Sequence, residues 1–189
     1  MEIRLTTKGD SAALLRIYAQ YIDTPITFET VLPSEREFTA RFASISGIYP
    51  CLVAGENGRI IGYAYAHRQM ERAAYQWNAE LSIYLDRAFT SRGLGRKLYA
   101  VLMEILKRQG IKTVYGGGTV PNPAREKLHL ALGFRRIGIY RRTGYKCGAW
   151  HDVAWFEKAI APCRPEPEPV LPVERIPAEK LDALIRKYQ

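Results

Sequence analysis

The clearest chemical feature of this chain is a glycine turn at residues 92–97, with the sequence RGLGRK. Two glycines one residue apart let the backbone turn tightly, so that successive N–H groups and the positive end of a following helix can point at one anion. We therefore expect a phosphate-binding loop. An ordinary tight connection between a strand and a helix explains a lone Gly-x-Gly turn equally well, so other residues must separate the two interpretations.

Two titratable side chains near this turn suit proton transfer. Glu80 interrupts an apolar run just ahead of the turn, where partly dry surroundings would raise the pKa of its carboxyl group and make it a usable base. His129 lies nearly two turns into a helix that we expect Asn122 to cap, and histidine can donate or relay a proton near neutral pH. A solvent-facing strand glutamate and an ordinary helical histidine are the alternatives.

The elements on either side of the turn are a predicted strand and a predicted helix. Residues 81–85 are rich in aliphatic and aromatic side chains, which is typical of a strand. A dinucleotide-binding motif is disfavoured, because Leu98 stands where that motif has its third glycine. A P-loop is disfavoured as well, because its Gly-Lys-Ser/Thr is missing. Apolar residues recur at helical spacing until Gly110, the expected C-terminal cap: Leu98, Val101, Leu102, Ile105 and Leu106.

The surrounding sequence predicts a mixed α/β sheet. Asn57-Gly58 is a strong hairpin signal between two apolar runs. Ser34 and Glu37 form an expected capping box, and Asp10 is the expected cap of the first helix. Predicted strands cover residues 2–7, 51–54, 60–66, 75–85, 134–140 and 153–158, with another from Lys112, and predicted helices follow Asp10, Ser34 and Asn122.

The sequence predicts that the chain consists of three segments. Residues 1–160 form one domain, and residues 161–176 form a stiff proline-rich linker because prolines cannot sustain a helix or a central strand. Residues 177–189 predict a short amphipathic helix with Leu181, Leu184, Ile185 and Tyr188 on one face. Such a helix is marginal alone, so we expect it to dock on its own domain or on a neighbouring subunit.

Composition narrows the class of protein. The 189 residues are 47% hydrophobic, enough for one substantial core, and no apolar run approaches a membrane span, so we expect a cytoplasmic protein. Cys51, Cys147 and Cys163 are far apart and lack metal-ligand spacing, so neither a disulfide framework nor a metal site is expected. The net charge of +9 is spread along the chain without a nucleic-acid motif, which favours a polyanionic small molecule over nucleic acid.

These motifs together carry a family resemblance. The glycine turn resembles the acetyl-CoA pyrophosphate loop of the GCN5-related N-acetyltransferases (GNAT), Gln/Arg-x-x-Gly-x-Gly/Ala, with Thr90 departing from its first position. The segments at 75–80 (YQWNAE), 94–99 (LGRKLY), 128–134 (LHLALGF) and 144–152 (GYKCGAWHD) resemble, in that order and spacing, the phosphinothricin and methionine sulfone N-acetyltransferase branch. The similarity runs from about Ile3 to Ile160.

The resemblance implies an acyl-CoA N-acyltransferase fold, a mixed and mostly antiparallel twisted sheet flanked by helices. It implies acetyl-CoA as co-substrate, a homodimer, and direct attack of an amine on the thioester in a ternary complex. Glu80 matches the family's catalytic base, and His129 matches the position from which the leaving sulfur is protonated. Backbone N–H groups of the strand would hold pantetheine and polarise the acetyl carbonyl. The implied cofactor-binding residues are Ile83, Tyr84, Leu85, Ser91, Arg92, Gly93, Leu94, Gly95, Arg96 and Asn122.

For the acceptor, the resemblance implies a small amino-acid-like molecule bound by Phe28, Arg72 and Tyr75. An arginine suits a carboxylate or phosphinate because its planar fork binds both oxygens, although Arg72 could instead be an exposed loop charge. Tyr145, Trp150 and His151 would shape the pocket wall or a dimer contact.

Two departures from the branch affect the expected site. Arg125 stands in place of a small serine, where it either adds a phosphate contact or faces water. Residues 116–118 are all glycine where the branch has bulkier aliphatics, and we expect a roomier cavity beside the acetyl group.

Three functions compete at this point. The first is acetyl-CoA-dependent N-acetylation of a phosphinothricin- or methionine sulfone-like amino acid, with Glu80 as base and His129 assisting. The second is the same chemistry on another amine, such as a peptide N-terminus or polyamine, which Arg72 disfavours because a cationic acceptor prefers acidic residues. The third is a non-catalytic acyl-CoA-binding or nucleic-acid-binding module, which the presence of both Glu80 and His129 disfavours.

Overall fold

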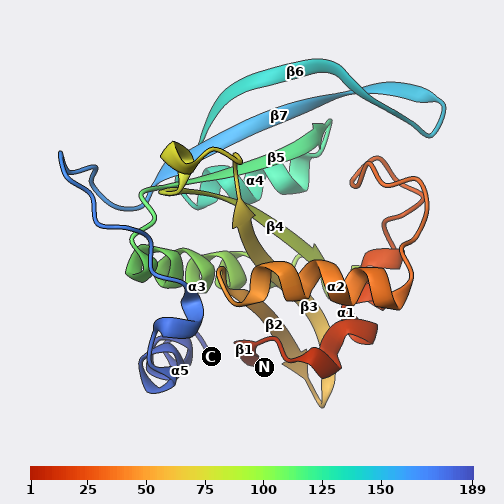
Figure 1. Cartoon of the computed structure of the whole chain (residues 1–189). Coiled ribbons are helices and arrows are strands. Elements are labelled where there is room, and N and C mark those ends of the chain that lie inside the picture. The colour runs from red at the N-terminus through yellow and green to blue at the C-terminus, as the bar shows by residue number, and fades with distance from the viewer.

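The computed structural model describes residues 1–189 and contains one seven-stranded sheet with the strand order β1-β2-β3-β4-β5-β7-β6 (Figure 1). Every neighbouring pair is antiparallel except β4 and β5, which are parallel. The expected mixed, mostly antiparallel sheet is therefore confirmed. The strands are β1 (Glu2–Leu5), β2 (Cys51–Glu56), β3 (Arg59–Arg68), β4 (Asn78–Leu85), β5 (Thr113–Val120), β6 (Arg135–Lys146) and β7 (Ala149–Ala159), and the helices are α1 (Ser11–Ala19), α2 (Glu35–Ser46), α3 (Leu94–Gln109), α4 (Pro123–Ala131) and α5 (Ala178–Arg186).

The parallel pair β4–β5 separates partway along its length. Pairing runs only from Asn78 opposite Thr113 to Glu80 opposite Tyr115, although β4 continues to Leu85 and β5 to Val120. Beyond Glu80, β4 keeps β3 as its neighbour and presents a free edge on its other side. The sheet thus opens at the residue that sequence reasoning selected as the base.

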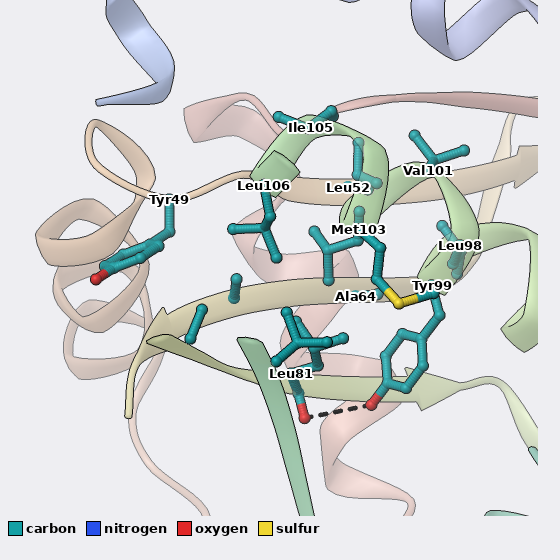
Figure 2. Close-up of a cluster of buried hydrophobic side chains, with 14 of the residues drawn as sticks. Tyr49, Leu52, Ala64, Leu81, Leu98, Tyr99, Val101, Met103, Ile105 and Leu106 are labelled. Carbon is teal, nitrogen blue, oxygen red and sulfur yellow. Dashed lines mark hydrogen bonds between the residues drawn. The ribbon is translucent and has the colours of Figure 1, made fainter. Parts of the chain in front are cut away.

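Helix α3 forms the centre of the larger hydrophobic core. Its apolar residues, predicted from helical spacing, pack against β2, β3 and β4 and are fully buried (Figure 2). The Tyr99 hydroxyl donates a hydrogen bond to the Leu81 carbonyl at 3.2 Å, which ties the helix to β4. Gly110 ends the helix with φ of 97°, a backbone conformation that glycine adopts readily.

The opposite face of the sheet is covered by α1 and α2 through a second, aromatic cluster that includes Tyr18, Phe38, Phe42 and Tyr63. The expected capping box of α2 is confirmed, because the Ser34 hydroxyl accepts from the Glu37 N–H while the Glu37 carboxylate accepts from the Ser34 N–H.

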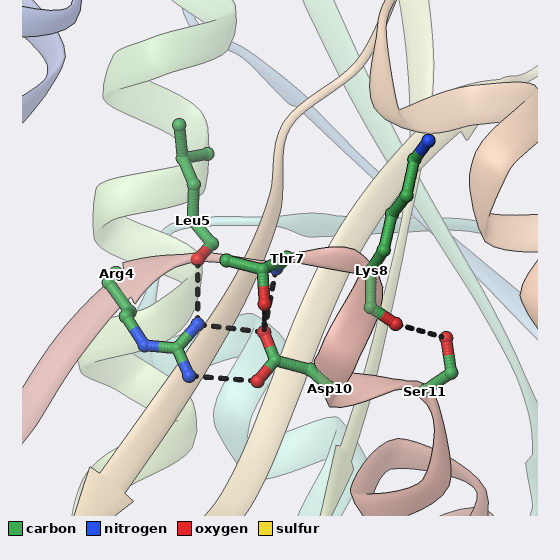
Figure 3. Close-up of polar contacts among 6 residues, drawn as sticks. All are labelled: Arg4, Leu5, Thr7, Lys8, Asp10 and Ser11. Carbon is green, nitrogen blue, oxygen red and sulfur yellow. Dashed lines mark hydrogen bonds and ion pairs between the residues drawn. The ribbon is translucent and has the colours of Figure 1, made fainter.

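The prediction that the Asp10 side chain caps α1 is wrong. Asp10 occupies the N-cap position, but its side chain makes no cap hydrogen bond to the helix. Its carboxylate instead accepts from both terminal nitrogens of Arg4, at 2.7 and 2.8 Å, and from the Thr7 N–H (Figure 3). The Arg4 hydrogen bond is the main cause that lowers the pKa of Asp10 to about 2. Asp10 therefore joins β1 to the start of α1.

The C-terminal segment folds back onto the same chain. The side chains of Val173, Ile176, Leu181, Leu184 and Ile185 are buried in the main core, with α5 against β1 and α3. The Gln189 side chain donates to the Ile3 carbonyl at 2.9 Å, so the two ends of the chain lie side by side (Figure 1). We expected this helix to dock on its own domain or on a neighbouring subunit, and in the structure it packs on its own domain. None of the helices combines the length and the apolar character that crossing a membrane requires.

Candidate active site

The glycine turn leaves a series of backbone N–H groups free at the start of α3. Gly93 has φ of 78° and Ser91 has φ of 63°, so the chain turns sharply before the helix begins. The first N–H of the helix with a backbone acceptor is that of Lys97, which donates to the Gly93 carbonyl at 3.2 Å. The N–H groups of residues 91–96 have no acceptor in the protein. Free N–H groups at the positive end of a 16-residue helix suit a phosphate.

The side chains around this turn add positive charge at its rim. The Arg92 guanidinium lies 4.8 Å from the centre of the Phe89 ring and 3.9 Å from the Glu56 carboxylate, and the side chain remains exposed. Arg96 is exposed on the first turn of α3. Thr90, the departure from the family pattern, uses its hydroxyl to donate to the Arg87 carbonyl at 3.0 Å. The predicted phosphate site therefore depends mainly on the backbone.

The free edge of β4 connects this turn to Glu80. The Asp86 N–H donates to the Ile61 carbonyl on β3 at 2.8 Å. Because successive residues of a strand direct their N–H groups to opposite edges, Ile83 and Leu85 direct theirs away from β3 and toward the opening. Tyr84 directs its N–H toward β3, whereas the sequence-based prediction grouped Tyr84 with Ile83 and Leu85. Ile83 and Leu85 thus offer the N–H groups expected to bind an extended, amide-containing ligand.

Glu80 lies where the two strands separate. It is paired with His67 on β3 and Tyr115 on β5, so these three side chains share the face that α1 and α2 cover. Burial raises the pKa of Glu80, while its electrostatic interactions with His67 and Arg125 act in the opposite direction. No ion pair holds its carboxylate. Glu80 is therefore not a freely solvated strand carboxylate, and its role as a base stays a prediction.

His129 is fully buried between aromatic rings. Its imidazole stacks on Phe156 with ring centres 4.8 Å apart and contacts the edges of Tyr99 and Phe134. Nδ1 lies 2.9 Å from the Arg125 carbonyl, which can only accept, so Nδ1 carries the proton and Nε2 is an unprotonated, unpartnered nitrogen. Burial, reinforced by the Arg125 charge, lowers the pKa of His129 to about 4. At neutral pH this histidine is uncharged.

The three glycines of β5 accommodate neighbouring side chains. A Cβ on Gly116 would lie 2.3 Å from Nε2 of His129, and one on Gly117 would lie 3.1 Å from the Trp155 ring. A Cβ on Gly118 would lie 2.5 Å from Cδ of Arg125. The expectation of a roomier cavity is therefore wrong at these positions, because larger side chains from α4 and β7 fill the space that the glycines leave.

Asn122 and Arg125 shape the start of α4. The Asn122 side chain accepts from the Arg125 N–H at 3.1 Å, which confirms the expected cap. The Arg125 side chain does not simply face water. It lies against Gly118, its Nε is buried, and it makes neither a hydrogen bond nor an ion pair.

The three residues expected to bind the acceptor are exposed and separate. Phe28 packs against Gly144 of β6, and its ring centre lies 6.4 Å from that of His151. Arg72 precedes the short 3₁₀ helix Ala73–Tyr75, in which Tyr75 is 40% exposed. No aromatic contact, hydrogen bond or ion pair joins Phe28, Arg72 and Tyr75 to one another. Their common role in binding stays a prediction.

The loop that carries Phe28 is nevertheless firmly held. The Tyr18 hydroxyl lies 2.5 Å from the Thr27 hydroxyl in a buried hydrogen bond. The buried Lys146 side chain donates to the Thr27 carbonyl at 2.7 Å, linking this loop to the end of β6. Tyr145 and Trp150 form an edge-to-face pair on the β6–β7 hairpin and are 60% and 62% exposed. They therefore form outer surface rather than a buried wall.

Sequence reasoning missed the side chains that share a face with Glu80. Tyr65 on β3 is paired with Ser82 of β4, two residues away from the pair His67 and Glu80 on each strand. Tyr65 therefore lies on the same face as Glu80. The alternation of β4 itself indicates that Ser82 and Tyr84 lie on the same face as Glu80. The partners on β3 depend on strand register, which no local motif in this sequence reveals.

Known proteins resemble this chain in sequence and in fold. A family model described as the acetyltransferase (GNAT) domain matches residues 3–155. The chain is 36% identical over 177 residues to the phosphinothricin N-acetyltransferase of Streptomyces viridochromogenes, covering 93% of this chain and 96% of that protein. It is 30% identical to the L-methionine sulfoximine/L-methionine sulfone acetyltransferase of Salmonella typhimurium, covering 83% and 93%. The crystal structure of a phosphinothricin acetyltransferase from Sinorhizobium meliloti in complex with AcCoA superposes with a TM-score of 0.84 at 32% identity, covering 88% and 92%.

Proposed function

Because this chain belongs to the GNAT family and is an acetyl-CoA-dependent N-acetyltransferase of the phosphinothricin and methionine sulfone branch, we propose that its acceptor is the amino group of a small amino acid analogue. Phosphinothricin, methionine sulfone and methionine sulfoximine define the chemical type: an α-amino acid whose side chain carries further polar oxygens. The names of the relatives support this acceptor class, and Arg72 suits an acidic acceptor group.

The observation that carries the proposal is a pair of groups of unpaired backbone donors, one at the start of α3 and one on the edge of β4 that begins at the half-buried Glu80. The free N–H groups of residues 91–96 suit the phosphates of coenzyme A, and the β4 edge at Ile83 and Leu85 suits its extended amide arm. The free edge of β4 begins at Glu80, where the sheet opens. A base is needed there because an amine at neutral pH is mostly protonated and cannot attack a carbonyl.

We assign Glu80 as that base. Its pKa is raised by burial, which improves its match to the proton it must accept near neutral pH. After deprotonation the amine attacks the acetyl carbonyl directly, and backbone N–H groups of β4 stabilise the developing oxyanion without any side chain. His129 is the second candidate residue, although its buried, uncharged state limits its Nε2 to accepting a hydrogen bond.

We further propose that two copies associate through the β6–β7 hairpin. This hairpin presents Tyr140, Tyr145 and Trp150, which are all more than half exposed. Exposed aromatic groups of this size favour an interface. Sedimentation of wild type beside Trp150→Ser tests the assignment: a dimer that weakens in the variant agrees with it, and a wild-type monomer contradicts it.

The acceptor proposal is tested by thiol release from acetyl-CoA across a panel of amines. The panel holds phosphinothricin, methionine sulfone, methionine sulfoximine, the common L-amino acids, spermidine and a short peptide. We expect turnover with one of the amino acid analogues and a raised KM for it in Arg72→Ala, with the exposed Arg108→Ala as a matched control. Turnover confined to spermidine or the peptide would contradict the proposal.

A further inference from the structure

The Arg125 side chain occupies an unusual position at the opening between β4 and β5. Cδ, Nε and Cζ would lie 2.5, 2.6 and 3.0 Å from a Cβ on Gly118, so the side chain lies directly on the backbone of β5. Any side chain at position 118 would collide with it. The glycine and the arginine are therefore complementary, and together they place a permanent positive charge on the β5 side of the opening.

This charge has no partner in the protein. Arg125 makes no ion pair, and its buried Nε has no hydrogen-bond acceptor. Most buried polar atoms do have partners, so an unpartnered guanidinium nitrogen needs an explanation. A group that becomes negative only during the reaction would supply the missing partner.

The groups that surround Arg125 belong to the proposed site. Burial raises the pKa of Tyr84 on β4, and raises that of Tyr99 on α3 to about 12, while the Arg125 charge opposes both changes. Burial raises the pKa of Glu80, and the Arg125 charge acts against this rise. Burial lowers the pKa of His129, and the Arg125 charge lowers it further. Tyr84, Tyr99 and His129 are uncharged at neutral pH, so Arg125 is the cation at the opening, on the face of β5 that α4 covers, while Glu80 lies on the other face of the sheet.

The leaving group of the reaction requires stabilisation at this place. An amine that transfers its proton to Glu80 attacks a carbonyl within reach of Glu80, so the C–S bond breaks near the opening between β4 and β5, on whose β5 side Arg125 lies. His129 cannot easily protonate the departing sulfur, because its Nε2 carries no proton and its Nδ1 proton is bonded to the Arg125 carbonyl. Arg125 is the remaining cation.

We propose that Arg125 is a catalytic residue that stabilises the coenzyme A thiolate as it leaves, in place of proton transfer from His129. Glu80 takes one proton from the substrate ammonium, the amine nitrogen forms the C–N bond, and the C–S bond breaks with its electron pair going to sulfur. The second amine proton passes to water, and the thiolate remains beside the guanidinium until release. This assignment rests on the proposed function.

The thiol pKa of bound coenzyme A tests the assignment without any acceptor. Ultraviolet absorbance of the thiolate is titrated in the complex with coenzyme A and corrected with the complex of desulfo-coenzyme A, which removes the signal of the protein's own cysteines. A positive charge within a few ångströms lowers a thiol pKa by about 1–3 units. We expect such a shift in wild type, a partial shift in Arg125→Lys and none in Arg125→Ser, the residue expected from the family resemblance.

Controls separate this role from a structural one. Lys127→Gln removes an exposed charge from the same helix and should leave the thiol pKa unchanged. Thermal unfolding of Arg125→Ser should match wild type, and its kcat should fall about 10²-fold with little change in acceptor KM. Coenzyme A bound with an ordinary thiol pKa would overturn the role of Arg125 and leave the proposed function intact. Failure to bind coenzyme A at all would overturn both.

Discussion

At the scale of single residues, environment separates the two titratable groups that the sequence singled out. Glu80 is half-buried and His129 is fully buried, and in each case burial favours the neutral form. For a carboxylic acid this means a stronger base, whereas for an imidazole it means a weaker one. The same physical cause therefore makes Glu80 more suitable for accepting a proton and His129 less suitable for donating one.

The raised pKa of Glu80 predicts the acidic limb of the pH profile. The base works only when ionised, so kcat/KM should rise with pH through the pKa of Glu80, above the ordinary value of 4.5. Initial rates between pH 4 and 9 measure this limb. His67→Gln removes an interaction that lowers the pKa of Glu80 and should move the limb to higher pH, while a limb unchanged in that variant would contradict the assignment.

His129 predicts a loss of stability in mild acid. Its pKa falls from 6.5 in the unfolded chain to about 4 in the fold, so below pH 6.5 the unfolded state binds a proton that the native state refuses. The free energy of unfolding should therefore decline as pH drops from 6.5 to 4. The difference between the two pKa values corresponds to a loss of about 3 kcal/mol. Urea unfolding of wild type and His129→Leu at pH 7.5 and pH 5 measures this contribution. A decline equal in both proteins would show that other groups cause it.

At the scale of elements, the site depends on how β5 and α4 fit together. Gly116 and Gly118 leave room on one face of β5, and His129 and Arg125, one helical turn apart on α4, fill that room. The glycines thus fix the distance between helix and strand. A cavity beside these glycines was expected from sequence because composition shows which side chains are missing but not which neighbours replace them.

The fit predicts a specific cost at Gly116. A methyl group there would lie 2.3 Å from Nε2 of His129, so Gly116→Ala should lower the free energy of unfolding by about 1–3 kcal/mol. Denaturant unfolding measures the loss, and Gly138→Ala, where nothing lies within 4 Å, is the matched control. Adding His129→Ala should recover part of the loss. Simple additivity of the two substitutions would contradict the proposed contact.

At the scale of the whole molecule, the tail beyond the GNAT domain completes the fold. The family model ends at residue 155, yet Val173, Ile176 and α5 extend the main core. The backbone of Leu171 joins Gln109 at the end of α3, and Gln189 joins β1. This tail supports the face of the sheet that carries α3, and therefore the helix whose first turn is expected to bind phosphate.

This packing predicts that the tail unfolds together with the domain. Ile185 is 4% exposed, so Ile185→Ala should cost about 2–5 kcal/mol and lower the midpoint of a single unfolding transition. Lys180→Ala, at an exposed position on α5, should change little. Hydrogen exchange provides an independent measure, because the amides of residues 181–188 should exchange as slowly as those of α3. Rapid exchange confined to the tail would contradict the packing.

Much of the fold could be predicted from the sequence because the signals were local. The spacing of Leu98 to Leu106, the Ser34 capping box and the Asn57-Gly58 turn each depend on neighbouring residues, and the structure contains all three. The contacts of Asp10, the N–H direction of Tyr84 and the burial of His129 depend instead on strand register and packing between distant segments. Arg125 could be identified as a departure from the family pattern, but its position against Gly118 required the three-dimensional structure.

The central claim is that acetyl transfer at the end of the β4 edge uses Glu80 as base. The most direct test compares thiol release and acetyl-CoA binding for wild type and the isosteric Glu80→Gln, with the best acceptor of the panel. General base catalysis contributes about 10²–10⁴-fold, so kcat should fall by that factor while the Kd for acetyl-CoA stays unchanged. A Glu80→Gln enzyme that retains wild-type kcat at neutral pH would contradict the account.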